Sequence, residues 1–529
     1  MKARAAVVVA ALLAAVALTS CSSGGGRPVS SGSPAATSAA SAAPAISDAY
    51  RNYYEIFVGS FYDSNGDGVG DLNGVTDKLS YIHDDLGADG IWLTPINPSP
   101  SYHKYDITDY EAIDPSFGTM ADFEKLTAAA HAKGMRVLLD LVVQHTSSQH
   151  PWFQKAVAAL QAGKPSPYID YYHFSRTPKP GYVQYGSSNI YYSAVFSPDM
   201  PDLNLDDPAV RTEIANIVTF WIGKGADGFR LDATTSYYPN DQAASVSFIN
   251  WLTKKAQAAD PQAYVVGEAW TDTTTLTSYY ASGADFFNYP FATVDGTINT
   301  DIQAKDGTAL AEATQKWNAT IHAANPDAMD APFISNHDNP RPAGYLLRKL
   351  PAEKLSAATY LLMPGSPFIY YGEEIGMVGS GADPNKRMPM VWSDTDKKGT
   401  TQPPPGGTYD ESSVVPVDKQ LGNPKSLLSF YHDVLTLKAK YPGIARGTYT
   451  ALQASDESVL AFSDAYQGAT VYVLENLDTV AHTEDLAAMG VPSGAKVTDH
   501  LLTEGSKKPA LSGHRLTLPA GSIAIVSGP

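Results

Sequence analysis

The sequence predicts an α/β fold: a (β/α)8 TIM barrel with a small domain inserted after its third strand and a C-terminal antiparallel β-sandwich. Three acids predict the barrel, because Asp232, Glu268 and Asp338 each end an apolar run that is typical of a buried strand. The first two acids are 36 positions apart and the last two are 70 apart. One strand–helix unit takes roughly 30 residues or more, so the acids follow strands one unit and then two units apart. In this fold, that end of the strands carries the active site.

Two departures from the strand–helix repeat predict the other domains. Asp140 ends another apolar run but lies 92 positions before Asp232, far more than one unit, and the excess is rich in Tyr, Ser and Pro. Near the C-terminus, short alternating apolar segments such as Val459–Phe462 favour an antiparallel sandwich. The expected boundaries are 48–145 and 205–444 for the barrel, 146–204 for the inserted domain and 445–529 for the sandwich.

Apolar runs and helix end signals place the barrel elements along the chain. Pro95 stops one run, Gly134 ends an amphipathic segment, and Pro208 follows Asp207 at a helix start. The expected strands are 54–58, 90–95, 136–143, 228–232, 264–268, 285–287, 333–338 and 365–371, and the expected helices are 73–86, 119–133, one that starts at about 207, and 427–440.

The segment Gly228–Ala233 carries a charged pair. Arg230 and Asp232 share one face of the strand, because side chains alternate along it. A neighbouring guanidinium favours the ionised form of a buried carboxylate, and an ionised, weakly solvated carboxylate can act as a nucleophile. A purely structural ion pair is the alternative for an isolated Arg-x-Asp. The positions of Glu268 and Asp338 favour catalysis.

The charge balance argues against nucleic acid as a partner. The 529 residues carry a formal net charge of −18, whereas binding to phosphates needs a basic face. The hydrophobic fraction of 43% and the charged fraction of 17% are those of an ordinary globular protein, which we expect to be a monomer.

The N-terminus has the pattern of a targeting segment. Lys2 and Arg4 precede an apolar run that is too short to span a bilayer as a mature helix, and Cys21 is the only cysteine. The pattern resembles a bacterial lipoprotein signal at 1–21, which implies a lipid anchor on Cys21. Residues 22–47 are Ser, Gly, Ala and Pro and are expected to be a flexible tether. The protein is then expected on the extracellular face of the cell membrane; an ordinary secretory signal is the alternative.

A short loop near the start of the barrel carries oxygen ligands at alternate positions. Ca²⁺ takes several carboxylate and carbonyl oxygens at once, and glycines allow the tight winding that this requires. The loop therefore predicts one structural Ca²⁺, although a solvated turn rich in Asp and Asn is the alternative. The expected ligands are Asp63, Asn65, Asp67, Asp71 and the carbonyl of Val69.

The loop Tyr102–Tyr110 suits a sugar, because aromatic rings stack on its CH face while polar groups bind its hydroxyls. His103, Tyr105 and Asp106 are the substrate-binding candidates in this loop, and Arg341 is a further candidate after Asp338.

Taken together, these motifs resemble the α-amylase family of glycoside hydrolases over roughly residues 48–529. The segments that carry the resemblance are Asp140–His145, Gly228–Ala233, Gly267–Glu268 and Asn336–Asp338, supported by 90–95, 102–110, 200–204 and 365–372. The resemblance implies that Asp232 is the nucleophile, Glu268 the general acid/base and Asp338 the transition-state stabiliser. It also implies an orienting role for Arg230, and sugar contacts for His145, His337 and Tyr105.

The residues fit this chemistry independently. A retaining glycosidase needs two carboxyl groups about 5–5.5 Å apart, one of them ionised and the other protonated. Arg230 is expected to keep Asp232 charged, and the apolar neighbours of Glu268 are expected to raise its pKa. We therefore expect hydrolysis with retention of the α configuration through a covalent glycosyl-enzyme.

Some positions depart from the family pattern. Gln144, Thr235 and Ser236 stand where many members have Asn, Lys and His, so a second calcium site is not expected. The first calcium loop looks like that of oligo-1,6-glucosidases, and Met200–Asn204 looks like the group intermediate between oligo-1,6-glucosidases and neopullulanases. Tyr102 replaces an Asp that helps close the pocket of exo-acting members.

The open cleft implied by Tyr102 favours an α-amylase that cleaves internal α-1,4 bonds of starch and maltooligosaccharides. The alternatives within the family are an exo-acting α-glucosidase or oligo-1,6-glucosidase, a neopullulanase-like cyclodextrin hydrolase and a glucanotransferase. An alternative from another class is a non-catalytic glycan-binding lipoprotein, which would be expected to have lost at least one of the three acids.

Overall fold

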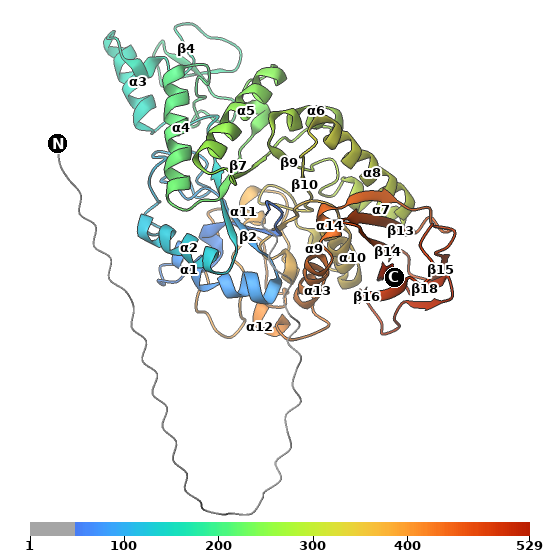
Figure 1. Ribbon diagram of the computed structural model, residues 1–529. Helices are drawn as coiled ribbons and strands as arrows, with labels where there is room; N and C mark the ends of the chain where they lie inside the picture. Colours follow the sequence, from blue (N-terminus) through green and yellow to red (C-terminus); the bar gives the residue numbers. More distant parts are fainter. Residues whose placement is uncertain (1–47, 529) are drawn as a thin grey trace, which may run out of the picture. The chain divides into compact units, whose positions relative to one another are not determined.

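The computed structural model describes residues 48–528 (Figure 1). The predicted signal, the tether and the lipidation site Cys21 lie outside these residues and stay predictions. Within residues 48–528, no helix combines the length and the apolar character needed to cross a membrane.

Eight parallel strands form the barrel in the order β10-β9-β8-β7-β3-β2-β1-β11. Two backbone hydrogen bonds of 2.9 Å join its last pair, from Ser366 N to Asp330 O and from Phe368 N to Pro332 O. The predicted fold class is confirmed. The strands are β1 (Tyr53–Ile56), β2 (Gly90–Leu93), β3 (Arg136–Leu141), β7 (Gly228–Leu231), β8 (Tyr264–Gly267), β9 (Asp285–Phe287), β10 (Asp330–Ala331) and β11 (Phe368–Tyr370).

One predicted strand was misplaced. The seventh strand covers Asp330–Ala331, whereas the apolar run that begins at Phe333 follows it as a loop. Pro332 separates the two, because proline has no backbone N–H to continue the ladder. The loop carries His337 and Asp338, so their side chains lie beyond the end of the strand.

Aromatic side chains fill the barrel interior. The ring of Tyr53 stacks between those of Tyr264 and Phe368, with centroids 5.5 and 4.7 Å away. Gly228 begins β7 with φ at 149°, and a Cβ there would lie 1.8 Å from the carbonyl oxygen of Tyr264. A side chain at position 228 would therefore push apart β7 and β8, the two strands that precede Asp232 and Glu268.

Helices surround the barrel. α13 has the predicted bounds 427–440, α2 lies within one residue of the predicted 119–133, and α4 starts at Pro208, close to the predicted position. Thr119 and Asp122 form a capping box at the start of α2, and the side chain of Asp207 caps α4. The helices are α1 (Leu72–Asp77), α2 (Met120–Ala132), α4 (Pro208–Gly223), α5 (Gln242–Ala259), α6 (Thr273–Tyr279), α7 (Thr297–Ala304), α8 (Gly307–Ala324), α9 (Pro342–Tyr345), α10 (Leu350–Leu361), α11 (Asp383–Lys386), α12 (Val417–Gln420), α13 (Leu427–Lys440) and α14 (Gly443–Arg446).

The helix predicted at 73–86 is interrupted once, at the turn residue Lys78, between helical residues 72–77 and 79–86. α1 ends at Asp77, and a separate π-helix covers Tyr81–Leu86. Tertiary contacts account for the break: the hydroxyl of Tyr81 donates to buried Glu374, and the ammonium of Lys78 lies over two aromatic rings.

The segment between β3 and α4 contains a helix and a small antiparallel sheet (Figure 1). Gln144 Nε2 donates to Asp202 Oδ1 at 2.9 Å, and Thr146 N donates to Pro201 O, so the two ends of the segment are joined beside the end of β3. Its elements are α3 (Pro151–Ala162), β4 (Phe174–Ser175), β5 (Tyr182–Gln184) and β6 (Tyr191–Ser193).

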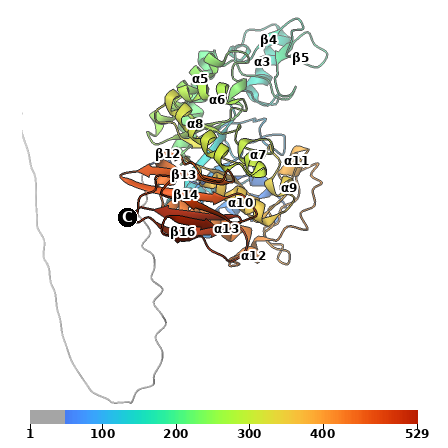
Figure 2. The same ribbon diagram turned by 90° about the vertical axis from the view of Figure 1, so that its right-hand side faces the viewer.

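Two antiparallel sheets form the C-terminal sandwich (Figure 2). One face of the larger sheet, including Phe462 and Val473, joins the core of the barrel helices, while the other face packs with the smaller sheet. The sheets are β12 (Thr448–Ala451), β13 (Val459–Tyr466), β14 (Ala469–Asn476), β19 (Ser522–Ser527) and β16 (Lys496–Leu502), and β15 (His482–Asp485), β18 (Arg515–Leu518) and β17 (Ala510–Ser512).

A buried carboxyl after β11 makes stability depend on pH. Glu373 accepts hydrogen bonds from the hydroxyls of Ser335, Tyr360 and Tyr431 at 2.5–2.8 Å. Burial nevertheless raises its pKa to about 7, because these neutral donors do not replace the solvation lost on burial.

We predict that Glu373→Gln changes the pH dependence of unfolding. An acid whose pKa is raised in the folded state binds more protons there than in the unfolded state. Its contribution to the free energy of unfolding therefore falls as pH rises from about 4.5 to about 7. The unfolding free energy of the variant relative to the native protein should therefore rise by up to about 3 kcal/mol between pH 4.5 and pH 8. Urea unfolding at pH 4.5 and pH 8 measures this change, with a substitution of an exposed acid, Glu457→Gln, as the control. If the variant and the native protein differ in unfolding free energy by the same amount at both pH values, the prediction is contradicted.

Candidate active site

One guanidinium lies at the centre of the site. Arg230, on β7, is 1% exposed, and its Nη1 donates to Asp140 Oδ1 and to Asp232 Oδ1, each at 2.8 Å. Its Nη2 donates to Glu268 Oε2 at 2.6 Å. Asp140 belongs to β3, and the other two acids each follow the last residue of their strand, so three adjacent strands place their carboxylates on one cation.

Two aromatic rings fix this guanidinium. Its carbon lies 5.1 Å from the ring centroid of Trp92 and 5.7 Å from that of Tyr105. The hydroxyl of Tyr105 also donates to Asp140 Oδ2 at 2.9 Å. Arg230 therefore has little freedom to move when a ligand approaches the carboxylates.

The third acid is held by cations of its own. Asp338 keeps 29% of its side chain exposed, accepts from Arg387 Nη2 at 2.7 Å and pairs with His337 Nε2 at 3.0 Å. Burial works against its ionisation, but His337 and Arg387 hold the pKa of Asp338 well below its usual range. Asp338 is therefore a fixed negative charge that remains partly open to a ligand.

His337 carries a positive charge at neutral pH. Its Nδ1 lies 2.6 Å from Glu55 Oε1, and its Nε2 faces Asp338. Burial disfavours the charged ring, yet the carboxylates of Asp338 and Glu55 raise the pKa of His337 to about 9. The ring also stacks on Tyr105, with centroids 5.5 Å apart.

The surroundings of Glu268 differ from the predicted apolar environment. Besides Arg230, its carboxylate accepts from Ala233 N at 3.1 Å and from the hydroxyl of Tyr289 at 3.0 Å. Trp270 is 57% exposed and stacks on Tyr289. Burial still raises the pKa of Glu268, with Arg230 opposing it, so the predicted direction holds for a different reason.

Burial also raises the pKa of Asp232, although Arg230 opposes the shift. The sequence predicts a buried Asp232 that Arg230 keeps ionised, but burial outweighs Arg230, and the negative charge of Asp338 adds to the upward shift of the pKa of Asp232. The same guanidinium serves Asp140, whose pKa burial raises to about 7. A single cation shared by three acids therefore favours a proton on at least one of them.

The charges of the site favour the retention of protons on its carboxyl groups. The carboxyl groups of the site outnumber its cations by two. The acids are Glu55, Asp140, Asp232, Glu268 and Asp338, and the cations are Arg230, His337 and Arg387. Two protons on these carboxyl groups would make the site neutral, and burial raises the pKa of Asp140, Asp232 and Glu268 alike.

The other predicted sugar contacts lie around Tyr105. His145 Nε2 lies 3.1 Å from Tyr105 O, and Tyr105 N donates to His103 Nδ1 at 3.1 Å. Asp106 accepts from the hydroxyl of Ser99 at 2.6 Å and is buried. These contacts assign His103 and Asp106 to holding the loop that carries the Tyr105 ring.

The prediction that Arg341 binds substrate is wrong. Its side chain is 0% exposed, Nη1 donates to Tyr371 O at 2.6 Å, and the guanidinium stacks on the ring of Tyr370. Arg387, which the sequence reasoning missed, lies beside Asp338 instead. Nothing in the sequence around Arg387 marks it, because it follows a short helix and ends no strand.

Two exposed aromatic side chains flank the catalytic groups. Phe196, on the inserted segment, is 49% exposed, and its ring centroid lies 5.4 Å from that of His145. Trp270 follows Glu268 by two residues. Exposed rings beside a polar centre are suited to stacking on sugar units.

The predicted calcium loop has only oxygen donors, which fits Ca²⁺. Its side chains already accept backbone hydrogen bonds: Asp63 from Gly68 N at 2.7 Å, Asn65 from Asp67 N at 2.9 Å and Asp67 from Val69 N at 2.8 Å. The hydroxyl of Ser64 donates to Asp71 at 2.7 Å. Among residues 48–528, the structure brings no three acidic, histidine or cysteine side chains into a metal-binding group, so this calcium stays a prediction.

Comparisons with known proteins agree with this geometry. The family described as "Alpha amylase, catalytic domain" matches residues 55–447. "Alpha-amylase 3" of Dictyoglomus thermophilum is 38% identical over 82% of this chain and 86% of its own. "Trehalose-6-phosphate hydrolase" of Escherichia coli is 30% identical over 80% and 89%.

A solved structure is similar over nearly the whole chain. "Eubacterium rectale Amy13B" is 38% identical, covers 92% of this chain and 96% of its own, and superimposes with a TM-score of 0.87. The family match spans Asp232, Glu268 and Asp338. It also spans Arg230, which binds Asp232 and Glu268. The chain therefore belongs to the α-amylase family of glycoside hydrolases.

Proposed function

We propose that the protein is an α-amylase that hydrolyses internal α-1,4-glucosidic bonds of starch and maltooligosaccharides. The observation that carries the proposal is the Arg230 guanidinium that binds Asp232 and Glu268 together, with Asp338 held beside them. Exposed Trp270 and Phe196 support a cleft that takes several sugar units. The similarity to a protein named as an α-amylase supports the same assignment.

The arrangement supports a retaining mechanism. Asp232 attacks the anomeric carbon while Glu268 gives its proton to the departing glycosidic oxygen, so the C–O bond breaks as the glycosyl ester forms. Glu268, now ionised, then takes a proton from water, which attacks the same carbon and releases Asp232. Two carboxylates on one guanidinium suit direct attack better than the separation of about 6.5–9.5 Å that an inverting enzyme needs for its water.

A contact near Asp338 favours exo action as the second candidate. The Tyr102 hydroxyl accepts from Arg387 Nη1 at 3.2 Å, while Nη2 of the same guanidinium binds Asp338. Tyr102 was interpreted as leaving this end of the cleft open, but in the structure it lies against Arg387. The pair could wall off one side of the sugar-binding site, as an α-glucosidase requires.

We predict that the protein cleaves a maltooligosaccharide blocked at its non-reducing end, because an endo-acting cleft does not need a free end. Product chromatography measures this, and Asp232→Asn should lower the rate on the order of 10⁴-fold. Glucose release from the unblocked chain alone would move the assignment to an α-glucosidase. Binding without any cleavage would favour the non-catalytic alternative.

We predict that the first product has the α configuration, because two displacements at one carbon restore its stereochemistry. Proton NMR during the first turnovers separates the α anomer from the β anomer before mutarotation mixes them. A β product formed first would exclude Asp232 as a covalent nucleophile.

We also propose that Asp63, Asn65, Asp67, Val69 and Asp71 bind one Ca²⁺. Calcium at about 100 times its Kd would add about 2.7 kcal/mol to the free energy of unfolding. Removing it with a chelator should therefore lower Tm by roughly 2–4 °C. Differential scanning calorimetry checks this. Asp67→Ala should abolish the difference, whereas Asp109→Ala, another exposed acid in a turn, should keep it; an equal Tm in calcium and chelator would refute the site.

A further inference from the structure

A tyrosine that the sequence did not mark is bonded to Glu268. Tyr289 lies two residues after the end of β9 and is 6% exposed. Its hydroxyl donates to Glu268 Oε1 at 3.0 Å. Its ring stacks on that of Trp270, with centroids 4.9 Å apart, and meets that of Phe333 edge-on, with centroids 5.0 Å apart. Neighbouring rings therefore hold the Tyr289 ring in place independently of its hydroxyl.

Asn336 decides the direction of this hydrogen bond. Its side-chain oxygen accepts from Asp338 N at 2.9 Å and from Asn339 Nδ2 at 2.7 Å. Its side-chain nitrogen therefore faces the hydroxyl oxygen of Tyr289, at 3.1 Å. That nitrogen can donate but not accept, so the tyrosine directs its single proton to Glu268. Burial raises the pKa of Tyr289 well above its ordinary value, so the hydroxyl keeps this proton at neutral pH.

The two oxygens of Glu268 have different hydrogen-bond partners. Oε2 accepts from Arg230 Nη2 at 2.6 Å and from Ala233 N at 3.1 Å, which uses both of its lone pairs. Among residues 48–528, Tyr289 is the one donor to Oε1, so a lone pair of Oε1 is free. The proton that Glu268 transfers must therefore sit on Oε1, beside the tyrosine hydroxyl.

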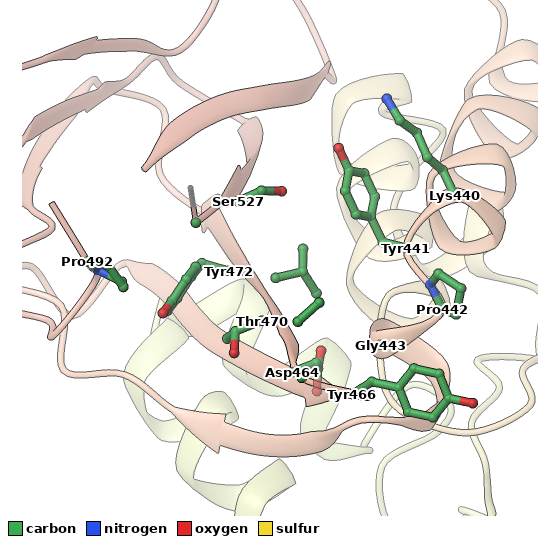
Figure 3. A pocket seen from close by; sticks show the side chains of 14 residues that line it. Lys440, Tyr441, Pro442, Gly443, Asp464, Tyr466, Thr470, Tyr472, Pro492 and Ser527 are labelled. Carbon is green, nitrogen blue, oxygen red and sulfur yellow. The ribbon is translucent and has the colours of Figure 1, made fainter. Parts of the chain in front are cut away.

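A buried carboxyl group elsewhere lacks such donors. Asp464 lies at the pocket between the end of α13 and the C-terminal sandwich, and neither of its oxygens has a hydrogen bond to any of residues 48–528 (Figure 3). Burial raises its pKa well above its usual range. Glu268 is also buried, but it has three donors that favour its ionised form. The Tyr289 hydroxyl is the one of these that can be removed without changing the backbone or the central guanidinium.

We propose that Tyr289 is a positioning residue for Glu268, which it holds so that the proton on Oε1 is presented to the glycosidic oxygen. The role of Glu268 as the acid rests on the proposed function. On transfer, the Oε1–H bond breaks, and the departing oxygen gains the proton and keeps the electron pair of the C–O bond. The carboxylate that remains still accepts from Tyr289, which keeps its own proton. The same hydrogen bond therefore holds Glu268 while it acts as a base on water.

Tyr289→Phe tests the hydroxyl, because phenylalanine keeps the packed ring. The hydroxyl favours the ionised form of Glu268, so its loss should raise the pKa of Glu268. The high-pH limb of kcat/KM for a maltooligosaccharide, which reports the loss of that proton, should move up by about one pH unit. Arg230, Asp232 and Asp338 are the charged groups that act most strongly on Glu268, and the variant leaves all three in place.

A second substrate separates positioning from a general structural defect. A nitrophenol departs as its anion, so its release from a nitrophenyl α-maltotrioside needs no proton from Glu268. The kcat/KM of Tyr289→Phe should fall about tenfold for maltooligosaccharides but by less than about twofold for nitrophenol release. The control is Tyr171→Phe, which removes a hydrogen bond from a tyrosine to Glu213 and should change neither. An equal fall for both substrates would overturn the proposal.

Infrared difference spectroscopy measures the protonation of Glu268 without any substrate. The protonated-carboxyl band that Glu268→Gln removes should titrate about one pH unit higher in Tyr289→Phe than in the native protein. An unchanged midpoint would overturn the proposal, while hydrolysis by the native protein would leave the proposed function standing. Failure of the native protein to hydrolyse any α-1,4-glucan would count against the proposed function, and a raised midpoint would still show that Tyr289 holds Glu268.

Discussion

The site depends on one buried guanidinium shared by three carboxylates. Arg230 compensates part of the negative charge of Asp140, Asp232 and Glu268, which could not all be buried and ionised without it. Because one cation cannot compensate three anions, a proton is favoured on at least one of these carboxyl groups. Burial is the main cause of the raised pKa values of all three groups, and the positive charge of Arg230 opposes it.

This charge balance requires the barrel to hold its strands rigidly. Arg230 pairs with Asp140 in the register of β7 and β3, and Glu268 follows the next strand. Stacked rings inside the barrel, and Gly228 where the backbones of β7 and β8 meet, fix that register. A shift by one residue would turn Arg230 to the other face and leave the acids unpaired.

The positions of Asp232 and Glu268 could be predicted because each follows a buried strand, and the strand ends of a barrel lie on one face, whereas Asp338 lies on the loop after β10. The role of Arg387 could not be predicted, because its position beside Asp338 depends on how a long loop folds after β11. The same holds for Arg341, whose proximity to Asp338 in sequence gave no information on burial. The π-helix at Tyr81–Leu86 was missed because the contact with Glu374 that accompanies it lies 293 positions away.

Specificity depends on the part of the site that sequence reasoning described least well. Tyr102 was interpreted from the absence of an acid at its position. In the structure its hydroxyl accepts a hydrogen bond from Nη1 of Arg387, while Nη2 of the same guanidinium donates to Asp338. Arg387 thus joins Asp338 to the side of the cleft where Tyr102 lies. If Arg387 stays in this place when a long chain binds, Tyr102 ends the cleft; if a sugar displaces it, the cleft opens. We propose that the strength of this one contact between a phenol and a guanidinium separates endo from exo action.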